Sequence, residues 1–164
     1  MPNFEKLMEE IIPYPADYTH RNGFSNLHII DKLNSSEKLE VEKALIAKLS
    51  EHPDDLLIVE TLTYLNSKDA LNSMYKLLID TQRAETKIVI ASCIFQISKD
   101  PNMCDLVFEA GKTISDKYSL ISMFYYLSKM NDKRINDLIR QYENHPDYLL
   151  SYNAKCSLGN HGQL

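Results

Sequence analysis

The stretch Ile58-Val59-Glu60-Thr61-Leu62-Thr63-Tyr64-Leu65 decides the fold, because it places a stripe of side chains along one side of a helix. The stripe consists of Ile58, Thr61, Leu62 and Leu65, with the spacing of three and four residues that one face of an α-helix requires. The same spacing returns at Ile90, Cys93, Ile94 and Ile97, and again at Leu120, Met123, Phe124 and Leu127. A recurring helical face indicates an internal repeat.

A second helical stripe alternates with these copies and keeps the same period. It consists of Leu71, Met74, Tyr75 and Leu78, then Met103, Leu106, Val107 and Ala110, then Ile135, Leu138, Ile139 and Tyr142. The segment HPDDLL at residues 52–57 returns as HPDYLL at residues 145–150, which fits three repeats of about 31 residues. Two helices per repeat predict an all-α, right-handed solenoid of about five antiparallel helix pairs.

The composition favours a single folded domain over residues 1–164. The chain is 44% hydrophobic and 25% charged, which is typical of a globular domain. It has only four glycines and six prolines, so we expect long helices with few interruptions. No leader-like segment opens the sequence, and no apolar run is long enough to cross a membrane. Three cysteines without paired spacing fit a reducing compartment, and we expect a cytoplasmic protein.

Caps and hydrophobic spacing set the expected helix bounds. Ser36 opens the first repeat, and Pro53, Pro101 and Pro146 mark helix starts, where a proline is tolerated. The expected helices of the four repeats, within residues 36–158, are 36–50, 54–66, 68–80, 84–98, 101–112, 115–130, 132–143 and 146–158. Residues 1–35 are expected to form an N-terminal capping pair of helices, and residues 159–164 a loose tail.

The capping pair contains an unusually long loop, at residues 13–23. The loop carries Tyr14, Tyr18, His20 and Arg21. Long loops inserted in a repeat are often functional, since the scaffold holds their ends. The alternative is that Tyr14 and Tyr18 fold back and cover the first layer of the core.

The last repeat departs from the hydrophobic pattern. The core positions of Leu120 and Phe124 are expected to correspond to Ser151 and Lys155 there, whereas Leu158 keeps the apolar character. A terminal repeat needs a polar outer face, and this loss of apolar residues fits that role.

Charge is distributed unevenly along the chain, whose formal net charge is -5. Residues 1–66 hold 6 Lys and Arg against 12 Asp and Glu, a net of -6, whereas residues 67–164 hold 12 against 11, a net of +1. An acidic surface repels phosphate groups and attracts cationic ones. The sequence therefore favours a basic protein partner, with no nucleic acid and no membrane. The alternative is that the carboxylates only hydrate helix surfaces.

Paired antiparallel helices at this period resemble short HEAT-like or armadillo-like repeats, of the bacterial type also found in relatives of phycobilisome lyases. The resemblance covers residues 3–158 and rests on the hydrophobic columns and helix starts quoted above. The chain has no Trp and so lacks the tetratricopeptide pattern, and the Thr-Pro-Leu-His of ankyrin repeats is also missing. The resemblance implies that the second helices of the pairs line a concave binding side.

Local motifs for catalysis and metal binding do not occur in the sequence. There is no His-Glu-x-x-His, no phosphate-binding glycine loop, no Gly-x-Ser-x-Gly and no Cys-x-x-Cys. Cys93 occupies a core column, which favours a small buried side chain over a nucleophile. The dispersed histidines are His20, His28, His52, His145 and His161. We expect no enzymatic activity, no cofactor and no metal.

The candidate binding residues are therefore surface residues of two kinds. Two polar or aromatic columns lie off the core stripe of the second helices, where a spacing of four keeps them on one face. The columns are Glu60, Ser92, Ser122 and Asn153, and Tyr64, Gln96, Tyr126 and Ser157. The candidate carboxylates are Glu37, Glu40, Glu42, Glu51, Asp54, Asp55 and Glu60. The alternative for the columns is a hydrated face without a partner.

The resemblance and the acidic N-terminal half together favour a protein that binds and neutralises its partner. Some small bacterial HEAT-like proteins are immunity proteins, which bind a basic nuclease toxin. The expected mechanism is occlusion, in which the carboxylates pair with the cationic residues that hold the toxin's nucleic acid, while electrostatic steering speeds capture. The alternatives are a general scaffold or adaptor, a HEAT-like DNA glycosylase, and a bilin lyase.

Overall fold

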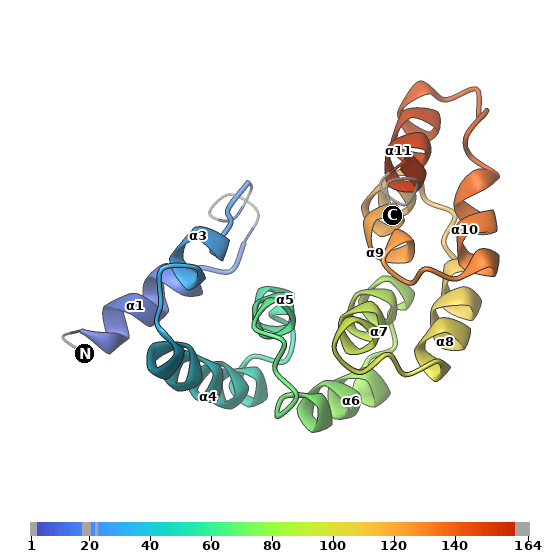
Figure 1. Cartoon of the computed structure of the whole chain (residues 1–164). Coiled ribbons are helices and arrows are strands. Elements are labelled where there is room, and N and C mark those ends of the chain that lie inside the picture. Colours follow the sequence, from blue (N-terminus) through green and yellow to red (C-terminus); the bar gives the residue numbers. More distant parts are fainter. Residues whose placement is uncertain (1–2, 18–20, 22, 160–164) are drawn as a thin grey trace. The chain divides into compact units, whose positions relative to one another are not determined.

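A computed structural model describes residues 3–17, 21 and 23–159 of the chain (Figure 1). All the regular elements in these residues are α-helices, as the sequence predicts. They divide into two compact units, residues 1–73 (the N-terminal unit) and residues 74–164 (the C-terminal unit), and each is described by itself. None of the helices in the described residues combines the length and apolar composition that a membrane-spanning helix needs.

The N-terminal unit contains α1 (Phe4–Ile11), α3 (Leu27–Ile30), α4 (Ser35–Glu51) and α5 (Leu56–Tyr64). A capping box fixes the start of α4. The Asn34 side chain accepts a hydrogen bond from the Glu37 N–H at 3.0 Å, and the Glu37 carboxylate accepts one from the Asn34 N–H at 2.9 Å. Helices α4 and α5 pack together. Their buried apolar residues are Val41, Leu45, Leu49, Ile58, Val59 and Leu62.

The second helix of the N-terminal pair is only a single turn, α3. The sequence predicts the second helix of this pair between the loop at residues 13–23 and residue 35, but the capping box at Asn34 already starts the next helix and limits its length. Asn26, just before α3, is 3% exposed. Its amide donates to the Ile11 carbonyl at 3.0 Å and to the Thr61 hydroxyl at 2.8 Å. One buried side chain therefore joins the end of α1 to α5.

The C-terminal unit contains α6 (Leu71–Asp80) from Met74 onward, α7 (Ala84–Ser98), α8 (Asn102–Gly111), α9 (Lys117–Ser128), α10 (Lys133–Arg140) and α11 (Tyr148–Gly159). Helix α9 contacts both α7 and α11, and α8 contacts α10. These five helices thus form two layers (Figure 1), with α7, α9 and α11 in one and α8 and α10 in the other. Within this unit, each of these helices therefore contacts a helix two places away along the chain.

The core confirms the hydrophobic stripes seen in the sequence. In the C-terminal unit, the stripe residues that are less than one-tenth exposed are Met74, Leu78, Ile90, Cys93, Ile94, Ile97, Met103, Val107, Leu120, Met123, Phe124, Leu127, Ile135 and Ile139. Phe124 is among the largest fully buried side chains, and its ring lies 5.5 Å from that of Tyr142 in the tilted geometry of a stable aromatic pair.

Helix α7 is buried on almost every side. Every residue from Ile88 to Ile94 is buried, and this run covers nearly two full turns. An amphipathic surface helix exposes several residues in two turns, so this helix belongs to the interior. The uninterrupted apolar run around Ser92 is the sequence signal of this burial.

The last repeat keeps its apolar core, one residue earlier than the sequence predicts. Leu150 is 5% exposed and Ala154 is 0% exposed, whereas Ser151 is half-buried and Lys155 is exposed. The expectation that Ser151 and Lys155 occupy the core columns is therefore wrong.

The cause of this shift is a difference in helix capping. Asp55, the second aspartate of HPDDLL, caps α5, whereas the single Asp147 of HPDYLL precedes α11 and accepts hydrogen bonds from the Leu149 and Leu150 N–H groups. Asp147 therefore corresponds to Asp55, and aligning the two segments letter by letter misplaces α11 by one residue.

Candidate functional site

The carboxylate of Asp55, predicted to face a partner, is buried instead. Asp55 is 7% exposed and accepts hydrogen bonds from Arg21 Nη1 at 2.5 Å and Nη2 at 3.0 Å. It also accepts a hydrogen bond from the Leu57 N–H at 3.2 Å, which caps α5. The expectation of an exposed Asp55 is thus corrected, because its oxygen atoms are committed to donors within the unit.

The other candidate carboxylates lie on the surface to different degrees. Glu40, Glu51 and Asp54 are exposed. Glu42 and Glu60 are half-buried, and Glu37 is half-buried in the capping box of α4. The exposed carboxylates in α4 and the following turn therefore form the available part of the predicted acidic surface.

The described part of the long loop is held by Arg21. Besides pairing with Asp55, Arg21 donates from Nε and Nη2 to the Pro13 carbonyl at 3.0 and 2.7 Å. Tyr14 is 46% exposed, and its ring lies 5.2 Å from that of His52. Burial, followed by the nearby Asp55 charge, raises the pKa of Tyr14. These contacts fit a structural closure of the unit, while Tyr18 and His20 lie outside the described residues.

The two predicted polar columns are only partly exposed. Ser92 is 0% exposed, and its hydroxyl donates to the Val89 carbonyl at 3.3 Å. The prediction that Ser92 lies on a binding surface is wrong, because every residue of α7 from Ile88 to Ile94 is buried. Gln96 and Asn153 are half-buried, and their amides donate to the carbonyls four residues earlier. Ser122 is exposed.

The two column tyrosines belong to different units and have different surroundings. Tyr64, in the N-terminal unit, is 46% exposed and donates its hydroxyl to Asp31 at 2.7 Å, and this hydrogen bond raises the pKa of Tyr64. Tyr126, in the C-terminal unit, is half-buried and packs edge-to-face on Tyr125. Tyr125 is the more exposed of these two neighbours, so the solvent-facing aromatic position of α9 lies one residue earlier than predicted.

A cluster of exposed tyrosines in α9 and α11 was not predicted. Tyr118 is 69% exposed, Tyr125 56%, Tyr148 72% and Tyr152 53%. We call these four residues the tyrosine face. Together with Leu149 they make up five of the ten exposed large hydrophobic side chains among the described residues. Such a concentration on two helices marks a surface that is suited to a partner.

Local geometry places the tyrosine face on one side of the C-terminal unit. In α9, Tyr118, Ser122 and Tyr125 are separated by four and three residues and lie opposite the buried Leu120, Phe124 and Leu127. In α11, Tyr148 and Tyr152 stack with their ring centres 5.8 Å apart. The sequence signal for this face is a spacing of 30 residues, which relates Tyr118 to Tyr148 and Ser122 to Tyr152.

A salt bridge aligns the two helices that carry the tyrosine face. Lys117 Nζ, at the start of α9, lies 2.6 Å from the Asp147 carboxylate, which immediately precedes α11. Since α9 and α11 also pack together, they run side by side in the same direction. Tyr118 and Tyr148 follow these two residues directly, so both rings project from the same end of the helix pair.

Tyr152 is the member of the tyrosine face whose hydroxyl interacts with a neighbouring thiol. A hydrogen bond with Cys156, followed by the effect of charge on Cys156 and Tyr148, raises the pKa of Tyr152. The phenol therefore keeps its proton well above neutral pH. Cys156 is an exposed thiol one turn farther along α11.

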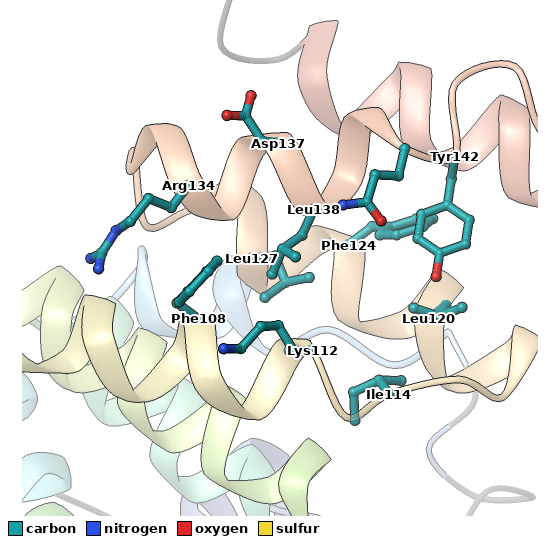
Figure 2. Close-up of a pocket in the computed structure, with 12 residues that line it drawn as sticks. Phe108, Lys112, Ile114, Leu120, Phe124, Leu127, Arg134, Asp137, Leu138 and Tyr142 are labelled. Carbon is teal, nitrogen blue, oxygen red and sulfur yellow. The ribbon is translucent and has the colours of Figure 1, made fainter.

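A cavity of about 480 Å³ lies between α8 and α10, with α9 contributing to its lining. Figure 2 shows Phe108 and Lys112 on the α8 side and Arg134 and Leu138 on the α10 side. Lys112 and Arg134 both lie over the Phe108 ring, at 4.6 and 5.2 Å from its centre. This arrangement offers apolar and aromatic contacts to a small ligand.

The charged groups around this cavity are already paired. Lys112 contacts Glu109 at 2.8 Å, and Arg134 contacts Asp105 and Asp132 at 2.8 and 3.0 Å. Hydrogen bonds to Asp132 and Asp105 raise the pKa of Arg134. These contacts satisfy both cations, and the tyrosine face is the stronger candidate for a binding site.

Within the described residues, no group of three or more His, Cys, Asp and Glu side chains has an arrangement that could hold a metal ion. The chain matches no protein-family model, no curated protein and no solved structure.

Proposed function

We propose that the chain is a protein-binding module without catalytic activity and that the tyrosine face is its main contact surface. The observation that carries this proposal is the exposure of four tyrosines on two adjacent, parallel helices. Tyrosine is enriched among the residues that contribute most to binding energy in protein interfaces. Its rigid ring supplies a large contact area, and its hydroxyl supplies a specific hydrogen bond.

The proposal includes the arrangement expected from the resemblance to HEAT-like repeats. In it, the helix pairs continue as one right-handed solenoid, and the second helices form the binding side. The layer of α7, α9 and α11 in the C-terminal unit supports this assignment, because the tyrosine face belongs to second helices. A layered repeat gives such a surface a rigid support, and this limits the entropy lost on binding.

The test is affinity purification from the native host with the wild-type chain and the Tyr148→Ala/Tyr152→Ala variant. A partner that also binds as a purified protein should be retained by the wild type and lost by the variant. Ile79→Ala is the matched control, because Ile79 is a 77% exposed apolar residue of α6 outside the tyrosine face. Equal retention by all three chains would contradict the proposal.

A second candidate function follows from the charge of the N-terminal unit. Residues 1–73 hold 7 Lys and Arg against 13 Asp and Glu, a net of -6. The exposed Glu40, Glu51 and Asp54 give a basic partner accessible carboxylates. In this proposal the chain is a bacterial, cytoplasmic immunity protein that neutralises a basic nuclease toxin by covering its nucleic-acid site.

The immunity proposal is tested with the purified product of the neighbouring open reading frame. Replacing Glu40, Glu51 and Asp54 by Lys should slow association and flatten its dependence on salt, because exposed charges act mainly on the rate of encounter. Lys43→Glu, a reversal on the same helix, is the control and should not slow association. A neighbouring product that is acidic, or association that ignores the triple reversal, would rule out occlusion by these carboxylates.

A further inference from the structure

We infer that the tyrosine face binds an acidic segment of its partner, a peptide stretch in which Asp or Glu alternates with apolar side chains. The inference rests on the proposed protein-binding function and names the chemistry of the partner. It sets the tyrosine face apart from the acidic N-terminal unit, to which a basic partner is assigned.

The surface around the tyrosine face carries a local positive charge. Helices α9 and α11 contain no Asp or Glu, although Asp and Glu outnumber Lys and Arg in the chain as a whole by 23 to 18. The charged residues in and next to these helices are Lys117, Lys129 and Lys155, with Asp116 and Asp147 at the helix starts. Three positive and two negative charges leave a net of +1.

Both carboxylates are also committed to groups within the unit. Asp116 accepts a hydrogen bond from the Ser119 N–H at 2.9 Å and caps α9, and Asp147 is paired with Lys117 and caps α11. Helix α7, the neighbour of α9 in the same layer, contributes Glu85 and Lys87, whose charges cancel. The surface therefore keeps a net charge of +1, and Lys129 and Lys155, which lie away from the two helix starts, are the positive groups that attract a carboxylate.

Two other tyrosines of this chain donate their hydroxyls to carboxylates. Tyr64 donates its hydroxyl to Asp31 at 2.7 Å, and Tyr75 donates to Asp100 at 2.6 Å. Hydrogen bonds to a charged acceptor are about twice as strong as those between neutral groups. The hydroxyls of the tyrosine face can make the same bond to a carboxylate of the partner.

A lysine lies next to one of the exposed rings of the tyrosine face. Lys129 Nζ lies 4.8 Å from the centre of the Tyr125 ring, a cation–π contact that holds the ammonium group close to the face. A partner carboxylate at this position meets a cation and a phenol together. The ring surfaces of Tyr148 and Tyr152, and the exposed Leu149, then take the apolar residues of the peptide.

Single-stranded nucleic acid is the competing occupant, because it also uses lysines and stacked aromatic rings. Affinity for a phosphate backbone grows with the number of Lys and Arg residues that contact it, and Lys129 and Lys155 supply few such contacts. Nucleic acid is therefore an outcome to be tested and not the expected ligand.

The experiment is selection of a phage-displayed library of random peptides on the full-length chain. The selected peptides are synthesised and measured by fluorescence anisotropy, with oligothymidine as a parallel probe. We expect the peptides that bind the wild type, and fail to bind Tyr148→Ala/Tyr152→Ala, to be enriched in Asp and Glu. The Lys129→Glu/Lys155→Glu variant should bind them roughly tenfold more weakly, as loss of two exposed ion pairs implies. Circular dichroism verifies that both variants fold.

The outcomes separate the inference from the proposed function. If the selected peptides need the tyrosines for binding but are neutral or basic, the inference of an acidic segment is wrong and the protein-binding function stands. If no peptide distinguishes the wild type from the tyrosine variant, both are wrong. If oligothymidine binds through the tyrosines and no peptide binds, the ligand of the tyrosine face is a nucleic acid and not a peptide.

Discussion

Lys117 and Asp147 join the starts of α9 and α11 across 2.6 Å, and Asp147 at the same time caps α11. The same carboxylate therefore sets where α11 begins and how it lies against α9. A helix rotates its side chains by about 100° per residue, so an error of one residue at this cap would turn Tyr148 and Tyr152 away from the tyrosine face.

The Lys117–Asp147 pair should make the free energy of unfolding depend on pH in the acidic range. The hydrogen bond from Lys117 lowers the pKa of Asp147 in the folded chain. Because this pKa is lower in the folded chain, the Asp147 carboxylate stabilises the fold at pH values above its pKa in the unfolded chain. This stabilisation is lost as the pH falls through its pKa in the folded chain. Urea unfolding at several pH values should therefore show a smaller loss of stability in acid for Asp147→Asn than for the wild type. With Glu40→Gln as control, the acid dependence should match the wild type. An unchanged acid dependence in Asp147→Asn would contradict the role of the pair.

Phe124→Ala tests the core of the C-terminal unit. The side chain is 1% exposed and packs beside Tyr142, so its truncation leaves a cavity. The free energy of unfolding, measured in urea, should fall by about 3–5 kcal/mol. Ser122→Ala, an exposed change two residues away, should alter it by no more than about 0.5 kcal/mol. A loss below about 1 kcal/mol for Phe124→Ala would mean that Phe124 is not a core residue.

Ser92 and Ser122 belong to the same predicted polar column, yet they should respond differently to replacement by lysine. Ser92 is 0% exposed and Ser122 is exposed, so Ser92→Lys buries an ammonium group that has no partner. We expect Ser92→Lys to lower the free energy of unfolding by about 3 kcal/mol or more, and Ser122→Lys to change it by less than about 0.5 kcal/mol. Thermal unfolding followed by circular dichroism makes the comparison. Similar melting temperatures for the two variants would show that α7 is not interior.

Removing only one member of the Arg21–Asp55 pair should lower the free energy of unfolding strongly. The two side chains are 14% and 5% exposed, so Asp55→Ala leaves a mostly buried guanidinium without its partner. The expected loss of stability is about 3–5 kcal/mol, and Arg21→Met combined with Asp55→Leu should recover part of it. Urea unfolding of the single and double variants measures both. If the double variant is as unstable as Asp55→Ala, the cap at Leu57 and not the ion pair is the important contact.

The helices and most of the core could be predicted from sequence, because both depend on local spacing. Ile90, Ile94, Leu120 and Phe124 are buried as their periodicity predicts, and α7 spans Ala84–Ser98, the predicted range. A residue's place on a helical face depends on neighbours three and four positions away, and a single sequence contains that information.

The errors came from contacts between distant residues and from a change in capping. Asp55 looks like a surface carboxylate until Arg21, 34 residues earlier, is placed beside it. Ala154 is too weakly hydrophobic to reveal the register of α11. The second aspartate before α5, which has no counterpart before α11, concealed the shift of one residue. The tyrosine face went unpredicted because correct alignment of Tyr152 with Ser122 depends on that register.

The interior position of α7 divides the C-terminal unit into parts with different freedom to change. Between Ile88 and Ile94 a substitution acts first on packing, since no residue there is exposed. On the outer sides of α9 and α11, the four tyrosines are each more than half exposed and can be exchanged at little cost to folding. Mutation can therefore redirect the unit toward a new ligand while its framework stays intact, which makes this part of the chain a suitable starting scaffold for selecting binders.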